Sequence, residues 1–375
     1  MRILVTGVTG QLGTAVAEVA AERGIDLVPL VRADRPGRVP FARAFPHLDH
    51  AKVVGDVRLP RWGLTDAVLD ALGDTVDAVV NLAGDTDWAG SGRDLHAVNV
   101  LGARHGLEVT RELRRRSGRR VLHCHASSIF VAGGLIGPIA ERQLAVDRHR
   151  TAYEHSKWTA ERELAAQARP DDPADPDVLI CRVCALVGDS RTGRTLKRNS
   201  LYLLAERWDD LPGRVLPLMP GARVDVLPRD VAAATLLDAV AGALRTGPRR
   251  EPTVVHVAAG ERAPTTRALL ETARSVSPAT FGRWVRVVPA TAAQVLWLSG
   301  NAERFWPLSR SWRNSLTGLR YIGLERVLER GALASLLPGP PPAPDTELIA
   351  RLLFDAPAPA TPVAPVDSGL SRFLP

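Results

Sequence analysis

Short apolar segments that alternate with segments of helical spacing constrain the fold of this chain more than any other feature. The apolar segments are Ile3–Thr6, Leu27–Val31, Val53–Val54, Ala78–Leu82, Val121–His123, Val178–Val183 and Val254–Val257. The helical segments between them include Leu12–Arg23, Leu64–Leu72, Val98–Arg116 and Tyr153–Ala168. Continuously apolar strands in such an alternation are typical of a parallel sheet covered by helices on both faces. The sequence therefore predicts an α/β fold with an open, doubly wound sheet of about seven strands.

A glycine-rich loop follows the first apolar segment. It reads TGVTGQLG and has the spacing G-x-x-G-x-x-G. Glycines at a strand–helix junction allow a tight turn and a close approach of the backbone to a pyrophosphate, and the N-terminus of the next helix offers free N–H groups. We expect this loop to bind a dinucleotide, the alternative being a tight structural turn. The predicted binding residues are Gly7, Thr9, Gly10, Gln11, Leu12 and Gly13.

The end of the second apolar segment bears on which nicotinamide cofactor is used. An acidic residue at this position binds the ribose hydroxyls of NAD, whereas a basic residue favours the 2′-phosphate of NADP. Arg32 comes first in LVPLVRAD, and Arg35 and Arg38 lie a few residues further on. Asp34 is the competing acid. The order of these residues favours NADPH, with NAD as the alternative.

The segment YEHSKWTAE, residues 153–161, contains a Tyr and a Lys four residues apart. In a helix, Tyr153 and Lys157 share one face. A nearby ammonium favours the phenolate and lowers the pKa of a tyrosine from its usual value of about 10. We therefore expect this pair to deliver a proton during reduction of a carbonyl group, the alternative being an exposed pair on a helix surface.

Several segments together resemble the extended short-chain dehydrogenase/reductases, most closely the thioester-reductase and fatty-acyl reductase branch. They follow the order of that family over about residues 1–260, and the glycine loop and Tyr-x-x-x-Lys are shared by the whole superfamily. The segments are TGVTGQLG (6–13), LVRA (30–33), GDVRLPRWGL (55–64), VVNLAGDTDW (79–88), NVLGARHGLEV (99–109), HASSIFVAG (125–133), YEHSKWTAE (153–161), RVCALVGDSRTG (182–193) and VDVLPRDVAAA (224–234).

This resemblance implies a role for particular residues. It implies that the active site consists of Ser128, Tyr153 and Lys157, braced by Asn99. The cofactor would contact Asp56 and Val57 at its adenine, and Leu82, Ala83 and Gly84 along its middle. Ser128 has an alternative role as a cap or turn residue, because Ser127 is adjacent. The sequence departs from the family at Val183, where proline is usual, and at Ala83–Gly84, where Ala–Ala is common.

The same resemblance implies an NADPH-dependent reductase that converts an acyl thioester to an aldehyde or an alcohol. The thioester would be bound to CoA or to an acyl or peptidyl carrier protein. One alternative is another extended short-chain dehydrogenase that acts on a free carbonyl, an alcohol or a sugar nucleotide, such as an epimerase, a dehydratase or a hydroxysteroid-type enzyme. A second alternative is a cofactor-binding scaffold without turnover.

The alternation of strands and helices weakens after about Gly188 and returns briefly before residue 260. We expect a Rossmann-type NADP-binding domain over 1–188 plus 223–260. A smaller substrate-binding lobe would comprise 189–222 plus 261–337, and a short strand is predicted at Arg223–Val226. Residues 338–375 form a Pro/Ala-rich tail whose segments 338–344 and 356–365 are expected to be extended or disordered.

Charge and cysteine content limit the partners and the compartment. The net charge is +7, the pI is about 10, and nearly all the positive charge comes from arginine. This balance favours acidic partners, such as the phosphates of a cofactor or an acidic carrier protein, and no nucleic-acid motif is present. The run RELRRRSGRR (111–120) would either dock such a partner or form a solvated helix end.

The N-terminus MRILVTG begins a strand pattern and gives no sign of a secretory signal. The apolar run Ala290–Leu298 is too short to span a membrane. Three cysteines are expected to be buried and reduced, with no metal site, so we expect a cytoplasmic protein. Asp85 and Asp87 are expected to be loop residues rather than a catalytic pair. The oligomeric state stays open.

Overall fold

The structure is a computed structural model of the 375-residue chain. It describes residues 1–34, 40–88, 90–146, 149–168, 172, 175–206, 215–249, 251–276, 286–301 and 321–355. Arg35, Arg38 and the segment 356–365 lie outside the described residues.

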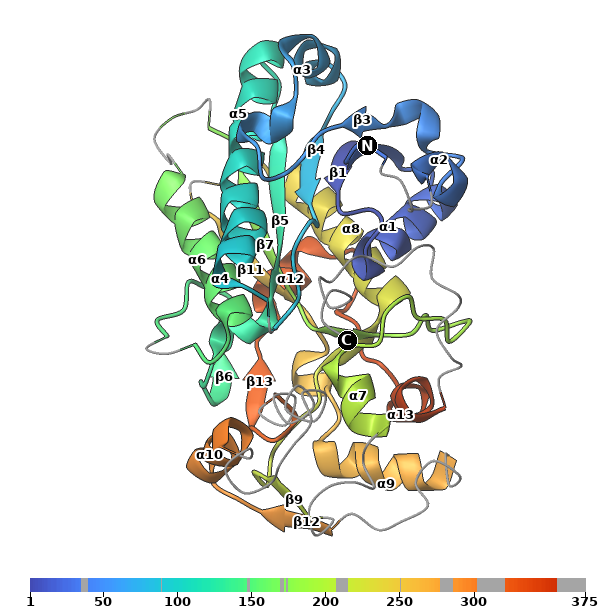
Figure 1. Cartoon of the computed structure of the whole chain (residues 1–375), viewed down its shortest axis with the longest axis vertical. Helices are drawn as coiled ribbons and strands as arrows, with labels where there is room; N and C mark the ends of the chain where they lie inside the picture. The colour runs from blue at the N-terminus through green and yellow to red at the C-terminus, as the bar shows by residue number, and fades with distance from the viewer. Residues whose placement is uncertain are drawn as a thin grey trace, which may run out of the picture.

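Seven parallel strands form the central sheet (Figure 1), which confirms the predicted α/β fold. Its order is β11-β7-β5-β4-β1-β2-β3, so the chain moves first to one side of β1 and then to the other. The strands are β1 (Arg2–Thr6), β2 (Asp26–Val31), β3 (Val53–Val54), β4 (Ala78–Asn81), β5 (Leu122–Ser128), β7 (Val178–Val183) and β11 (Thr253–Val257). The order reverses between β1 and β4, and at such a point a doubly wound sheet binds its ligand beyond the carboxyl ends of the strands.

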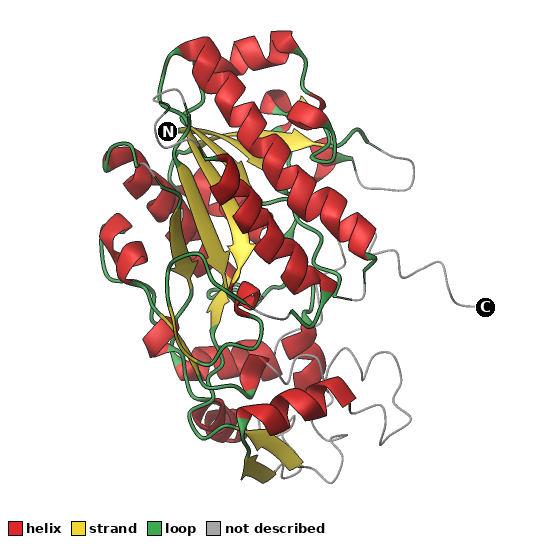
Figure 2. Ribbon diagram, turned by 90° about the vertical axis from the view of Figure 1, so that its left-hand side faces the viewer, coloured by secondary structure: helices red, strands yellow, loops and turns green. Residues whose placement is uncertain are grey.

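Helices cover both faces of this sheet (Figure 2) because successive side chains of a strand point to opposite faces. Ile3 and Val5 pack with α1 (Gln11–Glu22) and α8 (Arg229–Arg245) on one face. On the other face, Leu4 lies in a cluster with α3 (Asp66–Gly73) and α5 (Gly102–Ser117). Helix α6 (Ala152–Gln167) packs beside α5 on this second face.

Shorter elements surround this core. Three two-stranded parallel sheets join β8 (Ala185–Val187) to β10 (Val226–Pro228), β9 (Val215–Leu218) to β12 (Arg286–Pro289), and β6 (Gly137–Ile139) to β13 (Arg326–Leu328). The remaining α-helices that the structure describes with bounds are α2 (Phe41–Ala44), α4 (Gly92–Leu95), α7 (Ser200–Glu206), α9 (Thr266–Val276), α10 (Ala292–Asn301), α12 (Gly331–Leu336) and α13 (Thr346–Phe354). A π-helix over His96–Leu101 leads into α5.

A second apolar cluster lies in the lower part of the molecule in Figure 1. Leu204, Leu216, Leu269 and Ile349 are among its buried members, and they come from α7, β9, α9 and α13. Its members belong mainly to the region that we assigned to a substrate-binding lobe. The division of the chain into domains with the boundaries given above stays a prediction.

One local expectation, the strand at Arg223–Val226, needs correction. In the tail after residue 337, α13 buries Ile349, Leu352 and Leu353 against α9 and α7. The segment 338–344 itself contains no helix or strand. The strand expected at Arg223–Val226 begins only at Val226, since Arg223 forms an isolated bridge with Thr265. No helix in the described part of the chain is long and apolar enough to cross a membrane.

Candidate active site

The glycine loop lies at the switch point between β1 and β4. Gly7 has a φ of +70°, and a Cβ on it would lie 2.7 Å from the backbone N of Ala83. A Cβ on Gly13 would lie 2.1 Å from the carbonyl oxygen of Gly7. These two positions therefore accept only glycine without a change in the backbone.

The start of α1 fits an anionic group. Its N-cap is Gly10, no side chain caps the free N–H groups, and the first turn contains no acidic residue. An uncapped helix N-terminus next to a glycine turn favours a pyrophosphate. Thr9 and Leu12 belong to this loop; Thr9 is exposed and Leu12 is half-buried. The geometry fits the nicotinamide dinucleotide that the sequence indicated.

Gln11 has a role in the loop that the sequence did not reveal. Its side-chain amide donates to the hydroxyl of Thr195 at 3.0 Å, and its amide oxygen accepts from the backbone N–H of Lys197 at 3.0 Å. The segment 195–197 therefore lies against the phosphate loop. This contact joins residues 184 or more positions apart, so no local pattern could have indicated it.

Arg32, which follows β2, lies near Asp56, which follows β3. The pKa of Asp56 is lowered by hydrogen bonds from Arg58 and, to a smaller extent, by the charge of Arg32. Arg32 is exposed, as a residue that receives an external phosphate would be. Asp34 accepts a hydrogen bond from the backbone N–H of Phe41 at 3.3 Å, so its carboxylate is engaged within the chain.

Val57 follows Asp56 in the chain and contacts α5. Its carbonyl oxygen accepts a hydrogen bond from His105 Nδ1 at 3.1 Å, and its side chain packs against Gly102. These contacts hold the loop after β3 against the start of α5. The loop is thereby fixed at the carboxyl edge of the sheet, where the family resemblance implies an adenine site.

Ser128, Tyr153 and Lys157 come together at the carboxyl end of β5. Ser128 is the last residue of β5, while Tyr153 and Lys157 lie on α6, and all three are buried. The Ser128 hydroxyl hydrogen-bonds to Tyr153 and accepts from the backbone N–H of Phe130 at 3.2 Å. Ser128 thus takes part in a turn and also touches Tyr153, so the two interpretations of this residue coexist.

Lys157 lies between β5 and the loop after β4. Its Nζ donates to the carbonyl oxygen of Ala126 at 2.9 Å. A Cβ on Gly84 would lie 3.1 Å from Nζ and 3.4 Å from Asn99 Oδ1. The glycine at a position where the family commonly has alanine therefore leaves room for the ammonium and for Asn99.

The pKa of Tyr153 does not follow the sequence-based expectation. Burial raises it above 10, an effect that the hydrogen bond from Ser128 only partly offsets. Burial also lowers the pKa of Lys157 to about 8, partly opposed by the charge of Glu161. The expectation of a lowered pKa for Tyr153 is therefore wrong for this structure, because desolvation has the largest effect and the carboxylates of Asp85 and Glu154 raise the pKa further. Tyr153 is protonated at neutral pH and can act as an acid.

Asn99 braces the loop after β4. Its Oδ1 accepts from the backbone N–H of Asp85 at 2.8 Å, and its Nδ2 donates to the carbonyl oxygen of Asp85 and to Ser156 Oγ, each at 2.9 Å. The side chain of Asp85 accepts from the backbone N–H of Asp87 at 2.9 Å. The two aspartates therefore shape a loop, and Asn99 links this loop to α6 through Ser156.

An ion pair lies one helical turn beyond Lys157. Glu161 and Arg182 are almost fully buried, and Arg182 Nη2 lies 2.7 Å from Glu161 Oε2. Ser127 donates to Glu161 Oε1 at 2.5 Å. Together with Ser127, the pair joins α6 to β5 and β7. Sequence analysis missed it because Arg182 stands inside an apolar strand with nothing local to indicate its partner.

Aromatic side chains form one wall of the site. The ring of Tyr321 lies 4.0 Å from that of Phe130 and 5.0 Å from that of Trp88, between centroids. Phe130 follows Ser128 by two residues, and Trp88 belongs to the loop that Asn99 braces. The wall therefore combines segments that follow β4 and β5 with a residue from the C-terminal part of the chain.

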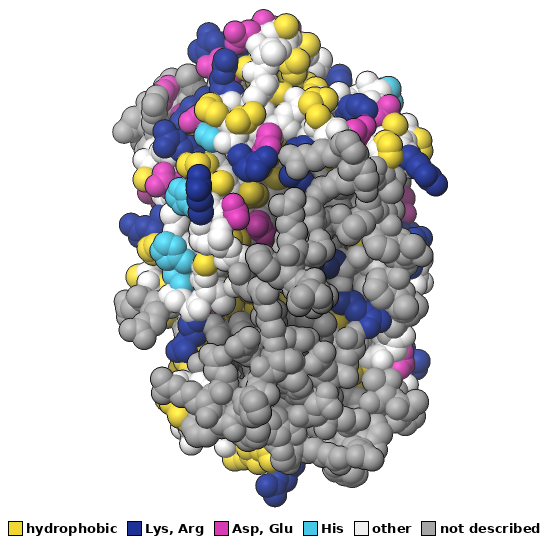
Figure 3. Space-filling model, in the orientation of Figure 1, with side chains coloured by type: hydrophobic (Ala, Val, Ile, Leu, Met, Phe, Trp, Pro, Cys, Tyr) yellow, Lys and Arg dark blue, Asp and Glu magenta, His cyan; other side chains and the backbone are white. Residues whose placement is uncertain are grey.

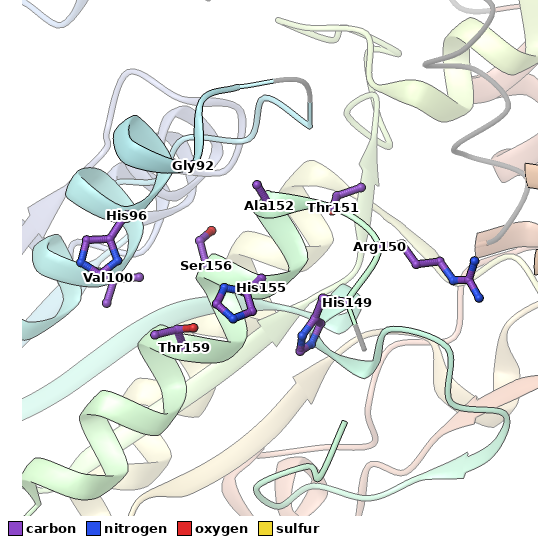
Figure 4. A pocket seen from close by; sticks show the side chains of 10 residues that line it. All are labelled: Gly92, His96, Val100, His149, Arg150, Thr151, Ala152, His155, Ser156 and Thr159. Carbon is purple, nitrogen blue, oxygen red and sulfur yellow. The ribbon is translucent and has the colours of Figure 1, made fainter. Parts of the chain in front are cut away.

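A cavity of about 570 Å³ lies on another face of α6, and Figure 4 shows the side chains that line it. His96, His149 and His155 line it, together with Ser156 and Thr159. His155 and Thr159 are four residues apart and share a helix face, as do Tyr153 and Lys157 on theirs. Neither Tyr153 nor Lys157 lines this cavity, and Ser156 is its link to Asn99.

The arginine-rich run at the end of α5 contacts carboxylates of its own chain. Arg111 pairs with Asp175 and Arg120 with Asp177, each at 2.5 Å. Further pairs are Arg115–Glu112, Arg116–Asp66, Arg116–Asp70 and Arg119–Asp77. Figure 3 shows basic and acidic side chains interspersed on the upper part of one face. These pairs favour a helix-end role for the run over a docking surface.

Comparisons with known proteins place this fold and site in a family. The family model described as male sterility protein matches residues 5–236. A polyketide synthase-nonribosomal peptide synthetase of Aspergillus clavatus is 28% identical over 196 residues, which cover 50% of this chain and 4% of that protein. The chain thus spans a small part of the length of this relative.

Solved structures share the fold. The terminal R domain from the myxalamid PKS-NRPS biosynthetic pathway has a TM-score of 0.68 at 21% identity, with 94% of this chain and 90% of that chain covered. A thiolation-reductase di-domain from an archaeal non-ribosomal peptide synthetase has a TM-score of 0.65 at 17% identity, with 95% and 74% covered. UDP-sugar epimerases have the same fold.

The family match covers the glycine loop, the loop after β4 and the helix that carries Tyr153 and Lys157. It agrees with the resemblance drawn from the sequence motifs, which is thereby confirmed. The chain belongs to the male sterility protein family of the extended short-chain dehydrogenase/reductases and is an oxidoreductase that depends on a nicotinamide dinucleotide.

Proposed function

We propose that this protein is an NADPH-dependent reductase of acyl thioesters bound to CoA or to a carrier protein, with an aldehyde or an alcohol as product. The observation that carries the proposal is the meeting of Ser128, Tyr153 and Lys157 beside a glycine cradle. The relatives named for polyketide and nonribosomal peptide synthesis support the thioester as substrate.

Each side chain has a distinct task in this reaction. When bound at the glycine loop, a reduced nicotinamide cofactor would supply the hydride for the thioester carbon. The Tyr153 hydroxyl donates its proton to the carbonyl oxygen, because its raised pKa keeps it protonated. The Ser128 hydroxyl donates a hydrogen bond to the same oxygen as negative charge develops there. Lys157 places a positive charge beside the site and assists the return of a proton to Tyr153.

The products follow from the atoms transferred. Addition of the hydride and the proton to the thioester gives a hemithioacetal. Its collapse breaks the carbon–sulfur bond, so the thiolate leaves and takes up a proton while the aldehyde forms. A second hydride and proton would convert the aldehyde to an alcohol.

We propose NADPH over NADH because Arg32 is exposed beside the predicted adenine site and Asp34 is engaged by a backbone N–H. The test measures oxidation of NADPH at 340 nm with a panel of acyl-CoA and carrier-bound acyl substrates. Thiol release is followed in the same reactions, and Tyr153→Phe is the control. Oxidation with release of an equal amount of thiol supports the proposal, whereas no oxidation across the panel contradicts it.

The second candidate function is a dehydrogenase or epimerase that acts on a free carbonyl, an alcohol or a sugar nucleotide. The shared fold of the UDP-sugar epimerases favours this candidate. Activity with free aldehydes, ketones or sugar nucleotides but not with thioesters would select it. A scaffold without turnover would follow if Tyr153→Phe left every activity unchanged.

A further inference from the structure

We propose that Tyr321 is a positioning residue for Tyr153, acting through the buried carboxylate of Glu154. The C-terminal part of the chain would thereby help to set the acidity and the position of the proton donor. This inference rests on the proposed function for its kinetic consequence, but its central test requires no substrate.

Glu154 is a buried carboxylate at the first turn of the helix that carries Tyr153. Its Oε2 accepts from the backbone N–H of Arg150 at 2.7 Å and from that of Thr151 at 3.4 Å, and Thr151 completes a capping box. Its Oε1 accepts from the hydroxyl of Tyr321. A buried carboxylate needs such donors, because its desolvation is otherwise costly. Tyr321 therefore supplies a hydrogen-bond donor to Oε1, whereas the backbone N–H groups of the helix cap donate only to Oε2.

The charge of Glu154 acts on its neighbour. It raises the pKa of Tyr153, an effect that ranks after burial, which is the largest, and after the charge of Asp85, which acts in the same direction. A hydroxyl that donates to the carboxylate opposes the negative potential of that carboxylate at nearby groups. Loss of the Tyr321 hydroxyl should therefore raise the pKa of Tyr153 further, and loss of the Glu154 charge should lower it.

Tyr321 also contacts the other segments of the site. Its ring packs on Phe130, whose backbone N–H is held by Ser128, and on Trp88. The next residue, Ile322, belongs to the second apolar cluster, and its carbonyl oxygen accepts from the hydroxyl of Thr266 at 2.5 Å. Two consecutive residues thus join that cluster to the catalytic helix.

The chain offers a matched set of variants, because it contains three tyrosines. Tyr321→Phe removes one hydroxyl and keeps the ring against Phe130 and Trp88. Tyr202→Phe removes another buried hydroxyl, which accepts from the backbone N–H of Gly188 at 2.7 Å, and serves as the control for loss of a buried hydrogen bond. Glu154→Gln removes the charge and keeps a capping-box side chain.

The pKa of Tyr153 is measured by NMR on protein labelled with ¹³Cζ-tyrosine, which gives three resonances assigned by the Tyr→Phe variants. We expect the pKa of Tyr153 to fall in Glu154→Gln, to rise in Tyr321→Phe and to stay within about 0.2 units in Tyr202→Phe. An unchanged titration of Tyr153 in both Glu154→Gln and Tyr321→Phe would overturn the proposal, whatever the substrate proves to be.

Kinetics give the second measurement. We expect Tyr321→Phe to lower kcat about tenfold while KM changes less than about twofold, since one charge-assisted hydrogen bond positions the acid rather than the substrate. A loss confined to KM, or a loss of kcat that Tyr202→Phe reproduces, would show that Tyr321 has only a structural role. If no substrate is turned over, the thioester proposal fails while the NMR result still decides this one.

Discussion

The ammonium of Lys157 donates to the carbonyl oxygen of Ala126 at 2.9 Å in a buried site, where its pKa falls to about 8. The lysine is therefore charged below about pH 8 and neutral above it. If the positive charge assists proton delivery, kcat/KM should decrease about tenfold per pH unit above pH 8.

A pH–rate profile from pH 6 to 10 measures this decrease in kcat/KM. Lys157→Arg is the control, because arginine stays charged over the whole range. The profile of this variant should lack the decrease in kcat/KM above pH 8, although the variant is slower than the wild type. A wild-type profile that stays flat to pH 10 would contradict a role for the charge.

Replacement of Lys157 by methionine should stabilise the folded protein at pH 7. The pKa of Lys157 in the folded protein lies below the ordinary lysine value of 10.5, so the folded state disfavours the charged lysine. The wild type therefore gains stability as pH rises from about 8 to 10.5. Methionine removes the cost of burying the charge and loses one hydrogen bond, for a net gain of about 2 kcal/mol at pH 7. Urea unfolding at pH 7 and at pH 10 measures the difference, which should shrink at the higher pH.

The glycine cradle gives a prediction about cofactor affinity. Gly13→Ala would place a Cβ 2.1 Å from the Gly7 carbonyl oxygen, so the loop must change shape. We expect NADPH to bind at least about tenfold more weakly and to give a smaller rise in melting temperature. Gly331→Ala is the matched control, since Gly331 also lies in the first turn of a helix and a Cβ there meets nothing within 4 Å. If the two variants bound NADPH with equal affinity, the glycine loop would not be part of the cofactor site.

Replacement of Arg32 by alanine should change the preference between the two cofactors. A single guanidinium on a phosphate is worth about 1.5–3 kcal/mol, so the Kd for NADPH should rise about tenfold or more while that for NADH changes little. Asp34→Ala tests the competing acid and should leave the affinity for NADH within about twofold. A large loss of NADH binding in Asp34→Ala would instead indicate an NAD enzyme.

The ion pair of Glu161 and Arg182 should be costly to break. Glu161→Gln leaves a buried guanidinium without its carboxylate, which typically costs about 3–5 kcal/mol of unfolding free energy. Glu347→Gln is the control, because Glu347 and Arg351 form an exposed pair on α13 that should contribute less than about 1 kcal/mol. Chemical denaturation of both variants at pH 7 makes the comparison. Losses of similar size would show that the buried pair contributes no more than the exposed one.

The sequence was sufficient to predict the central sheet. Short apolar segments and the glycine spacing are local signals, and each of the seven expected strands occurs in the sheet. Tyr153 and Lys157 were found by their spacing on one helix, which is also local. The roles assigned to these residues in binding and catalysis stay predictions.

What the sequence could not show depends on contacts between distant residues. Gln11 and Thr195, Glu154 and Tyr321, and Glu161 and Arg182 meet only when the chain has folded. The raised pKa of Tyr153 was not predicted for the same reason, since it results from burial by the whole fold and from the carboxylates of Asp85 and Glu154. Local spacing predicts which groups are close, whereas the degree of desolvation depends on everything around them.

Helix α13 follows a proline-rich stretch that composition alone would assign to a dispensable tail. Ile349, Leu352 and Leu353 belong to the second apolar cluster. Removal of the residues after 337 would therefore expose apolar side chains of α7 and α9 to water. A shortened protein that ended at the prolines would therefore tend to self-associate, and its loss of activity would say nothing about Ser128, Tyr153 or Lys157. Helix α13 thus packs in the same apolar cluster as Ile322.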